Sequence, residues 1–310
     1  MTDSHSSESA MLLTVDLLLV LLTAAVFGLN LRRHGRNVRD AYSQAITVRL
    51  AFVCLVTNGV FFLNVFWQIA TGKTGGKVQE TLGEVVSGVV EGIVLNSFFA
   101  LLVLQAGGTD RVVRVFAKET PGRDNAAAVA AMRYKRYRLT IHVFAAVRPI
   151  LAVLLQTLST TASPAKYLHA LLSVYNVVLL AAALFVVVRT LVALKAEIPP
   201  AFQATHKFVV IKLILLLATT QWTAYVFLDK EAEAPQHLKV YWSVCLVEAL
   251  LLSVAFYAVS APESFVASDS PRVHLWRLWD VVRDPIPEYK ALGSLQLTAF
   301  KAPLSPSVLL

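Results

Sequence analysis

Long apolar stretches dominate this sequence and limit what it can fold into. Seven of them have a length near that of a membrane span: residues 11–31, 48–70, 82–106, 139–160, 167–194, 208–228 and 240–260. About 20 helical residues cross the hydrocarbon core of a bilayer. The stretches are apolar on every side, whereas a helix on the surface of a soluble protein keeps one polar face. We therefore predict an all-α, polytopic membrane protein with seven transmembrane helices.

The charged residues agree with this class and predict an orientation. Only 15% of the 310 residues are charged, where a soluble domain has about 25%. Most of the 28 lysines and arginines follow the first, third, fifth and seventh stretches. Cytosolic loops carry such an excess of basic residues, so we expect the N-terminus outside and the C-terminus in the cytosol. The net charge of +8 follows from this bias and predicts no nucleic-acid partner.

This topology divides the chain into three parts. Residues 1–10 are predicted to be an extracellular or lumenal tail, residues 11–260 the seven-helix domain, and residues 261–310 a cytosolic tail. Within the cytosolic tail, residues 273–282 carry two tryptophans and one arginine and are expected to form an amphipathic helix at the membrane interface.

The longest cytosolic loop, residues 109–138, ends in a basic and aromatic cluster. The run Ala126–Met132 leads directly into Arg133–Arg138, which predicts a helix that continues into the fourth stretch. Two interpretations of the cluster stay open. It could anchor the loop at an anionic leaflet, at ~1 kcal/mol per basic residue near the surface, or it could only mark the cytosolic side.

Two opposite charges fall near the middle of the membrane. Glu91 lies inside the third stretch and Arg148 inside the fourth, and a rise of ~1.5 Å per residue brings both near the midplane. Charged groups inside the hydrocarbon are expensive and usually functional. A substrate or ion pathway is the first interpretation, and a purely structural ion pair is the second. Pro149 follows the arginine and should kink its helix.

Other polar residues inside the apolar stretches are candidates for the same pathway. They are Asn96, Asn176, Lys212, Gln221 and Glu248. Amides between membrane helices can also be simple packing contacts. Lys212 is close enough to the cytosolic edge for its side chain to reach the headgroups, and Lys207 and Lys212 together are expected to form an inner-face anchor and anion relay. Asp16 lies near the outer edge of the first stretch.

Small residues in the apolar stretches are expected to serve packing. In the third stretch Gly83, Ser87, Gly88 and Gly92 allow a close helix contact. The cysteines Cys54 and Cys245 are both placed in apolar surroundings, without a metal-binding spacing. We predict no disulfide, no metal and no other cofactor.

Several of these segments, taken in order, resemble the organic solute transporter subunit alpha family, including its transmembrane protein 184-type and Lazarus-type relatives. The segments are Val90–Gly92 with Asn96 to Gly108, Ala146–Pro149, Tyr175-Asn176 with Arg189, Lys207-Phe208 with Lys212 and Gln221, and Glu248 with Ala255-Phe256. The chain departs from the family pattern at Val90 and Gly92, where tyrosine and alanine are usual, and at Trp222, which follows the glutamine. It also lacks the cysteine-rich cluster of some animal members.

The resemblance implies a seven-span transporter of amphipathic organic solutes, such as steroid or bile-acid-like anions, by facilitated diffusion. In that reading Arg148, with Lys212, compensates the charge of the substrate, and Glu91 holds Arg148 in place. The implied partners are the lipid bilayer, an organic anion or sterol-like substrate, and a single-span beta-type subunit or a second copy of the chain.

Two other classes of function are weighed against transport. A seven-span receptor is disfavoured because the third stretch ends in Gly107–Arg111 without an Asp/Glu-Arg-Tyr motif, and the seventh stretch lacks Asn-Pro-x-x-Tyr. An endomembrane scaffold or trafficking protein stays open. Nothing in the sequence predicts an enzyme, and no phosphate-binding Gly-x-x-x-x-Gly-Lys-Ser/Thr motif indicates coupling to ATP. The membrane that the protein occupies, plasma or internal, is not distinguished.

Overall fold

The structure is a computed structural model that describes residues 2–71, 77–119, 125–158, 164–213 and 235–265. All of these residues belong to one compact unit, Met1–Val273. A second unit, His274–Leu310, lies outside the described residues, and so does the whole helix predicted at residues 273–282.

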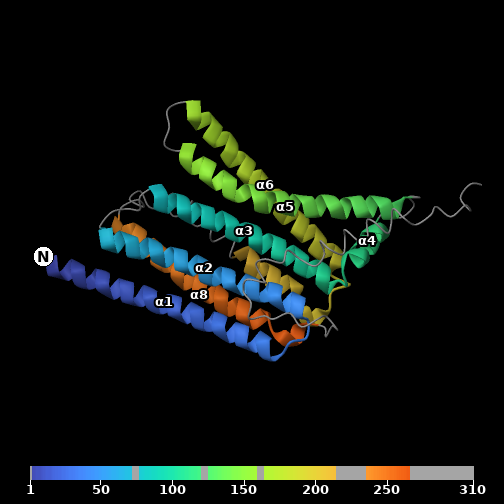
Figure 1. Cartoon of the computed structure of the whole chain (residues 1–310), viewed down its shortest axis with the longest axis horizontal. Helices are drawn as coiled ribbons and strands as arrows, with labels where there is room; N and C mark the ends of the chain where they lie inside the picture. Colours follow the sequence, from blue (N-terminus) through green and yellow to red (C-terminus); the bar gives the residue numbers. More distant parts are fainter. Residues whose placement is uncertain (1, 72–76, 120–124, 159–163, 214–234, 266–310) are drawn as a thin grey trace, which may run out of the picture. The chain divides into compact units, whose positions relative to one another are not determined.

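Every regular element in the described ranges is helical (Figure 1). The long helices are α1 (Thr2–Arg36), α2 (Ala41–Thr71), α3 (Lys77–Gln105), α5 (Ala126–Leu158), α6 (Pro164–Leu194) and α8 (Pro235–Val259). The short ones are α4 (Thr109–Lys118) and the 3-10 turns η1 (Pro200–Phe202) and η2 (Pro262–Ser264). Residues 204–213 form a further helical stretch. The all-α prediction is confirmed for the part of the chain that the structure describes.

Among the residues that the structure describes, all six long helices are long and apolar enough to cross a membrane. Each of these helices overlaps one of the seven predicted stretches, but they extend beyond the stretches by up to 13 residues, at the start of α5. The remaining stretch, residues 208–228, begins in the helical residues 204–213 and continues outside the described ranges. Seven spans and the orientation of the termini therefore stay predictions.

The sequence explains where several helices begin and end. Asp40 precedes α2 and accepts a hydrogen bond from the backbone N–H of Ser43, at 3.3 Å, which is the geometry of a helix N-cap. Gln44 Oε1 accepts from the backbone N–H groups of Arg39 and Asp40. α3 ends where Gly107 and Gly108 adopt φ values of 93° and 90°, a conformation that favours glycine. This pair turns the chain into α4.

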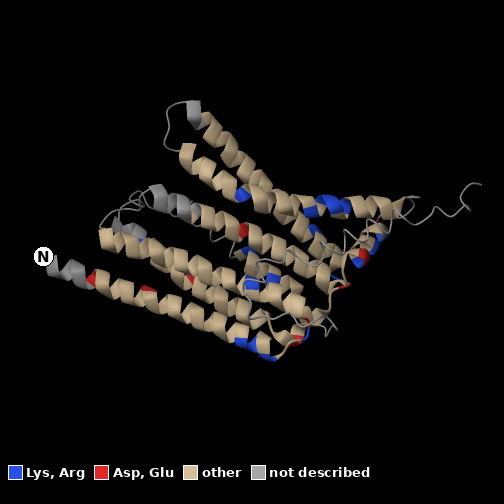
Figure 2. Cartoon of the chain, viewed as in Figure 1, with Lys and Arg blue, Asp and Glu red and all other residues tan. Residues whose placement is uncertain are grey.

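Charge and exposure follow the expected division between lipid and headgroups. Figure 2 shows basic residues gathered on α4, on the first half of α5 and at the end of α1, with long uncharged stretches between them. α5 runs unbroken from the basic cluster into its apolar half, as predicted. Large apolar side chains such as Leu18, Leu171 and Val177 are exposed on these helices, as expected of positions that contact lipid.

Candidate functional site

A buried ion pair joins α3 to α5. Arg148 Nε donates to Glu91 Oε2 at 2.7 Å, and Nη2 donates to Oε1 at 3.3 Å. The side chains of arginine and glutamate are only 7% and 1% exposed. The predicted meeting of the two charges is therefore confirmed, and the two-pronged geometry is the strongest that an arginine and a carboxylate can form.

Two glycines of α3 make this close approach of the helices feasible. A methyl group on Gly92 would lie 2.8 Å from Ala145 Cα, and one on Gly88 would lie 3.3 Å from Arg148 O. Contacts below 3.0 Å do not occur between real Cβ atoms and backbone. The packing role predicted for Gly88 and Gly92 is thus confirmed. At Gly83 nothing lies within 4 Å.

Pro149 modifies the backbone directly beside the pair. It lies inside α5 and has no N–H to donate, so the carbonyl of Ala145, four residues earlier, loses its helical hydrogen bond. That same carbonyl would lie 3.1 Å from a Cβ at Gly92. The backbone of α3 at Gly92 therefore packs against the Ala145 carbonyl, where the helical hydrogen bonding of α5 is interrupted one turn before Arg148.

The pair is electrically neutral, but the arginine has donors to spare. A guanidinium carries five N–H donors, and Glu91 takes two of them through Nε and Nη2. Among the described residues, nothing accepts a hydrogen bond from Nη1. Arg148 is thus a fixed cation inside the membrane that is oriented by one carboxylate and still able to hydrogen-bond an anion.

Two predicted amides are placed on neighbouring helices without hydrogen bonds to their oxygens. Asn96 lies on α3 and Asn176 on α6, both partly buried. In the described part of the structure, Oδ1 of each is buried and has no partner. α6 packs against both α3 and α5, so Asn176 belongs to the helix group that surrounds the pair. No direct contact between the amides and the ion pair is observed.

The other predicted site residues do not join the pair. Glu248 is partly buried on α8, which packs against α1 and α2. Lys212 is exposed on residues 204–213, which agrees with a side chain that reaches toward headgroups. Gln221 lies outside the described residues.

A second polar centre surrounds Lys207, whose side chain is fully buried. Its Nζ donates to the carbonyl of Phe202 at 2.6 Å and to Ser264 Oγ at 3.2 Å. It also lies 3.7 Å from the ring centroid of Phe202 and 4.9 Å from that of Phe265, within the range of cation–π attraction. We call these four residues the Lys207 cluster. It connects the chain after α6 to the chain after α8.

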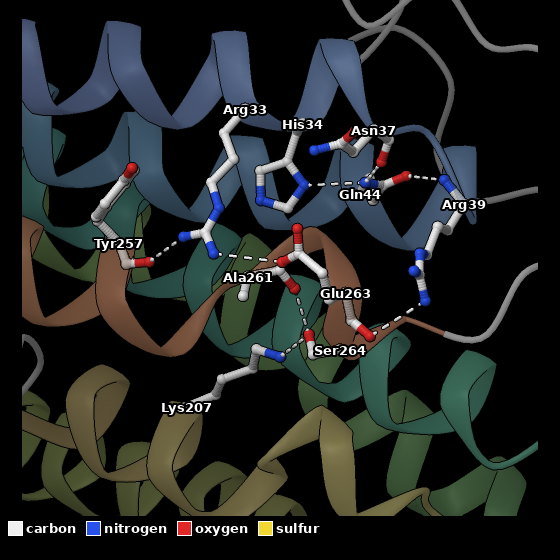
Figure 3. Close-up of polar contacts among 10 residues, drawn as sticks. All are labelled: Arg33, His34, Asn37, Arg39, Gln44, Lys207, Tyr257, Ala261, Glu263 and Ser264. Atoms are coloured by element: carbon white, nitrogen blue, oxygen red, sulfur yellow. Dashed lines mark hydrogen bonds and ion pairs between the residues drawn. The ribbon is translucent and has the colours of Figure 1, made fainter.

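Neighbouring contacts attach this cluster to α1 and α2 (Figure 3). Arg33 donates to the carbonyl of Tyr257 at 3.4 Å and to Glu263 Oε2 at 3.3 Å. Gln44 Nε2 lies 3.1 Å from His34 Nδ1, and the His34 ring packs edge-on against Phe265. Residues from four separate segments are thereby held at one end of the helices.

Burial lowers the pKa of Lys207. Lys207 precedes the predicted span 208–228, and loss of hydration lowers its pKa to about 7, because burial disfavours the charged form. The two acceptors and two rings around Nζ favour the charged form. The ammonium is therefore close to balance between charged and neutral forms near neutral pH.

The burial of Lys207 could not be expected from the sequence alone. As a basic residue at a membrane edge, it was predicted to be an inner-face anchor together with Lys212. The only local signal was the aromatic and proline-rich turn before it, Pro199–Phe202, which folds back over the ammonium. The described residues contain no group of three or more His, Cys, Asp or Glu side chains that could hold a metal ion.

Comparison with known proteins agrees with the observed architecture. The family model described as organic solute transporter Ostalpha matches residues 12–261. Among curated proteins and solved structures, nothing matches this chain.

Proposed function

The chain belongs to the organic solute transporter Ostalpha family, and from this premise we propose that it carries amphipathic organic anions, such as steroid or bile-acid-like conjugates, by facilitated diffusion. The family and the six apolar helices make it a multi-pass membrane protein of a solute transporter family. The substrate class and the mechanism are our proposal.

The observation that carries the proposal is the position of Arg148. It is a permanently charged group, since its guanidinium stays protonated in proteins, and it is buried between two membrane helices. Glu91 fixes its orientation, and Nη1 is left to donate to a passing carboxylate or sulfate. The unpaired amide oxygens of Asn96 and Asn176 could accept hydrogen bonds from hydroxyl groups of the same solute.

We further propose seven spans with the N-terminus outside. Six described helices supply six spans, and the apolar residues 208–228 supply the seventh. An odd number of spans agrees with the excess of basic residues after every second span. Single added cysteines at residues 5 and 300, labelled with a membrane-impermeant reagent in intact cells, test this orientation: only residue 5 should react.

Uptake of a radiolabelled steroid sulfate into proteoliposomes tests the proposed function. Arg148→Ala should abolish uptake and still insert into the membrane. Arg111→Ala is the matched control, because Arg111 also forms an ion pair, with Nε and Nη2 both donating to Glu197 Oε2, but is 47% exposed. Undiminished uptake by Arg148→Ala would remove this residue from the mechanism.

The same assay addresses the proposed partners and the alternative function. We expect a single-span beta-type subunit or a second copy of the chain as the protein partner, so uptake is measured alone and with a co-expressed candidate subunit. If the wild-type protein moves no solute from a broad panel of organic anions under either condition, an endomembrane scaffold becomes the better interpretation.

A further inference from the structure

A row of buried polar side chains runs along α1. This helix packs against α2 and α8, whereas the ion pair joins α3 to α5. Asp16, Thr23 and Asn30 follow one another at intervals of seven residues and are 0%, 0% and 1% exposed. Seven-residue spacing keeps them on nearly one stripe of a helix. His34, also fully buried, lies one turn beyond Asn30. With ~1.5 Å of rise per residue, the row is about 27 Å long, close to the ~30 Å of a bilayer core.

The helices packed against α1 contribute polar groups to this row. α1 packs against α2 and α8. From α8, Ser243 Oγ lies 2.9 Å from Asp16 Oδ2. From α2, Asn58 Nδ2 donates to Thr23 Oγ1, and Gln44 Nε2 contacts His34 Nδ1. We call the row of Asp16, Thr23, Asn30 and His34, with these partners, the α1 seam.

Much of the seam is left without hydrogen bonds in the described structure. Both amide atoms of Asn30 are buried and unpartnered, and so are Asp16 Oδ1, Asn58 Oδ1 and His34 Nε2. Each unsatisfied buried group costs roughly 1–3 kcal/mol. Polar residues that only glue membrane helices together are paired across the interface, and Asn30 is not. Water molecules, which occupy buried sites that offer several polar partners, would satisfy these atoms.

The charges that face the two ends of the seam differ. Around Asp16, α2 carries no charged residue between 50 and 71, while α8 carries Lys239 and Glu248; within the described residues Asp16 forms no ion pair. Around His34 lie Arg33 on α1, Lys207, and Glu263 after α8. A carboxyl group in hydrocarbon without a cationic partner becomes neutral by binding a proton.

We propose that the α1 seam is a hydrated proton path, with Asp16 as its proton-binding group and the His34–Gln44 contact as its opposite end. The path is separate from Glu91–Arg148, which lies between α3 and α5. It goes beyond the proposed facilitated diffusion of organic anions, because it gives the protein a second, proton-conducting activity.

Proton flux in proteoliposomes tests this proposal. Vesicles that contain a pH-sensitive dye receive an acid pulse, with valinomycin and potassium to compensate the charge. The wild-type protein should acidify the lumen faster than empty vesicles. Asp16→Asn should slow this flux by roughly 100-fold, as the loss of a positioned proton-transfer group does, and Asn30→Leu should block it by removing the middle of the seam. Thr14→Val is the control, since Thr14 lies on α1 with its hydroxyl bonded only to its own helix.

Uptake of the steroid sulfate at equal pH on both sides, measured on the same vesicles, separates this proposal from the proposed function. Uptake without proton flux in the wild type overturns the proton path and leaves solute transport standing; flux without uptake does the reverse. Flux that persists in folded Asp16→Asn and Asn30→Leu proteins would reduce the seam to a structural contact. Asn30→Ser, which keeps a small polar group, should retain flux and guards against a variant that merely fails to fold.

Discussion

Breaking the Glu91–Arg148 pair from one side should destabilise the protein far more than removing it whole. The side chains are 1% and 7% exposed, so neither charge can be rehydrated when its partner is lost. Glu91→Leu or Arg148→Met alone should cost about 3–5 kcal/mol of unfolding free energy. The double variant Glu91→Leu/Arg148→Met removes both charges and should lie within about 1–2 kcal/mol of the wild type, since an apolar pair replaces a buried ion pair at little net cost.

The exposed pair Arg111–Glu197 supplies an internal comparison. Its side chains are 47% and 19% exposed, and solvent screens the attraction between them, so the same cycle there should give a coupling energy below about 1 kcal/mol. Equilibrium unfolding in mixed detergent micelles, followed by tryptophan fluorescence, measures both cycles. A coupling energy for Glu91–Arg148 no larger than that of the exposed pair would refute the claim that the buried charges are desolvated and mutually dependent.

Two further predictions concern packing and pH. Gly92→Ala should destabilise the protein by about 1–3 kcal/mol through overpacking, because its Cβ would lie 2.8 Å from Ala145 Cα. Gly28→Ala is the control and should cause no loss of stability, because nothing lies within 4 Å of its Cβ position. Equal thermal midpoints for the two variants would contradict the close contact of α3 and α5. For Lys207, the pKa of about 7 in the folded protein lies below the usual value of 10.5. Between these two pH values the unfolded chain binds more protons than the folded protein, so the free energy of unfolding should rise with pH. This rise should vanish in Lys207→Met, and a Lys207 pKa above 10 measured by NMR would contradict the strong burial.

The sequence predicted the parts of the fold that depend on composition and spacing. Apolar length located six helices but not their ends, since α5 begins 13 residues before the predicted stretch. Depth alone indicated that Glu91 and Arg148 could meet. The packing role of Gly88 and Gly92 was also predicted, since small residues repeat on one face of the third stretch. These features are local, or they follow from the constant rise of a helix.

Features that depend on which helices become neighbours were not predicted. Lys207 looked like a surface anchor, because its burial requires the turn at Phe202 and the segment at Ser264, which are far apart in the chain. The seven-residue spacing from Asp16 to Asn30 was visible in the sequence. It acquires meaning only when α2 and α8 cover that face of α1.

Transport by the charge-free double variant tests the central claim most directly. Glu91→Leu/Arg148→Met should fold with near wild-type stability, so any loss of uptake reflects the missing cation and not a collapsed structure. We expect no uptake of the steroid sulfate above empty proteoliposomes, with unchanged uptake in the exposed control Arg111→Ala. Wild-type uptake by the folded double variant would contradict the role of Arg148 as the anion-binding group.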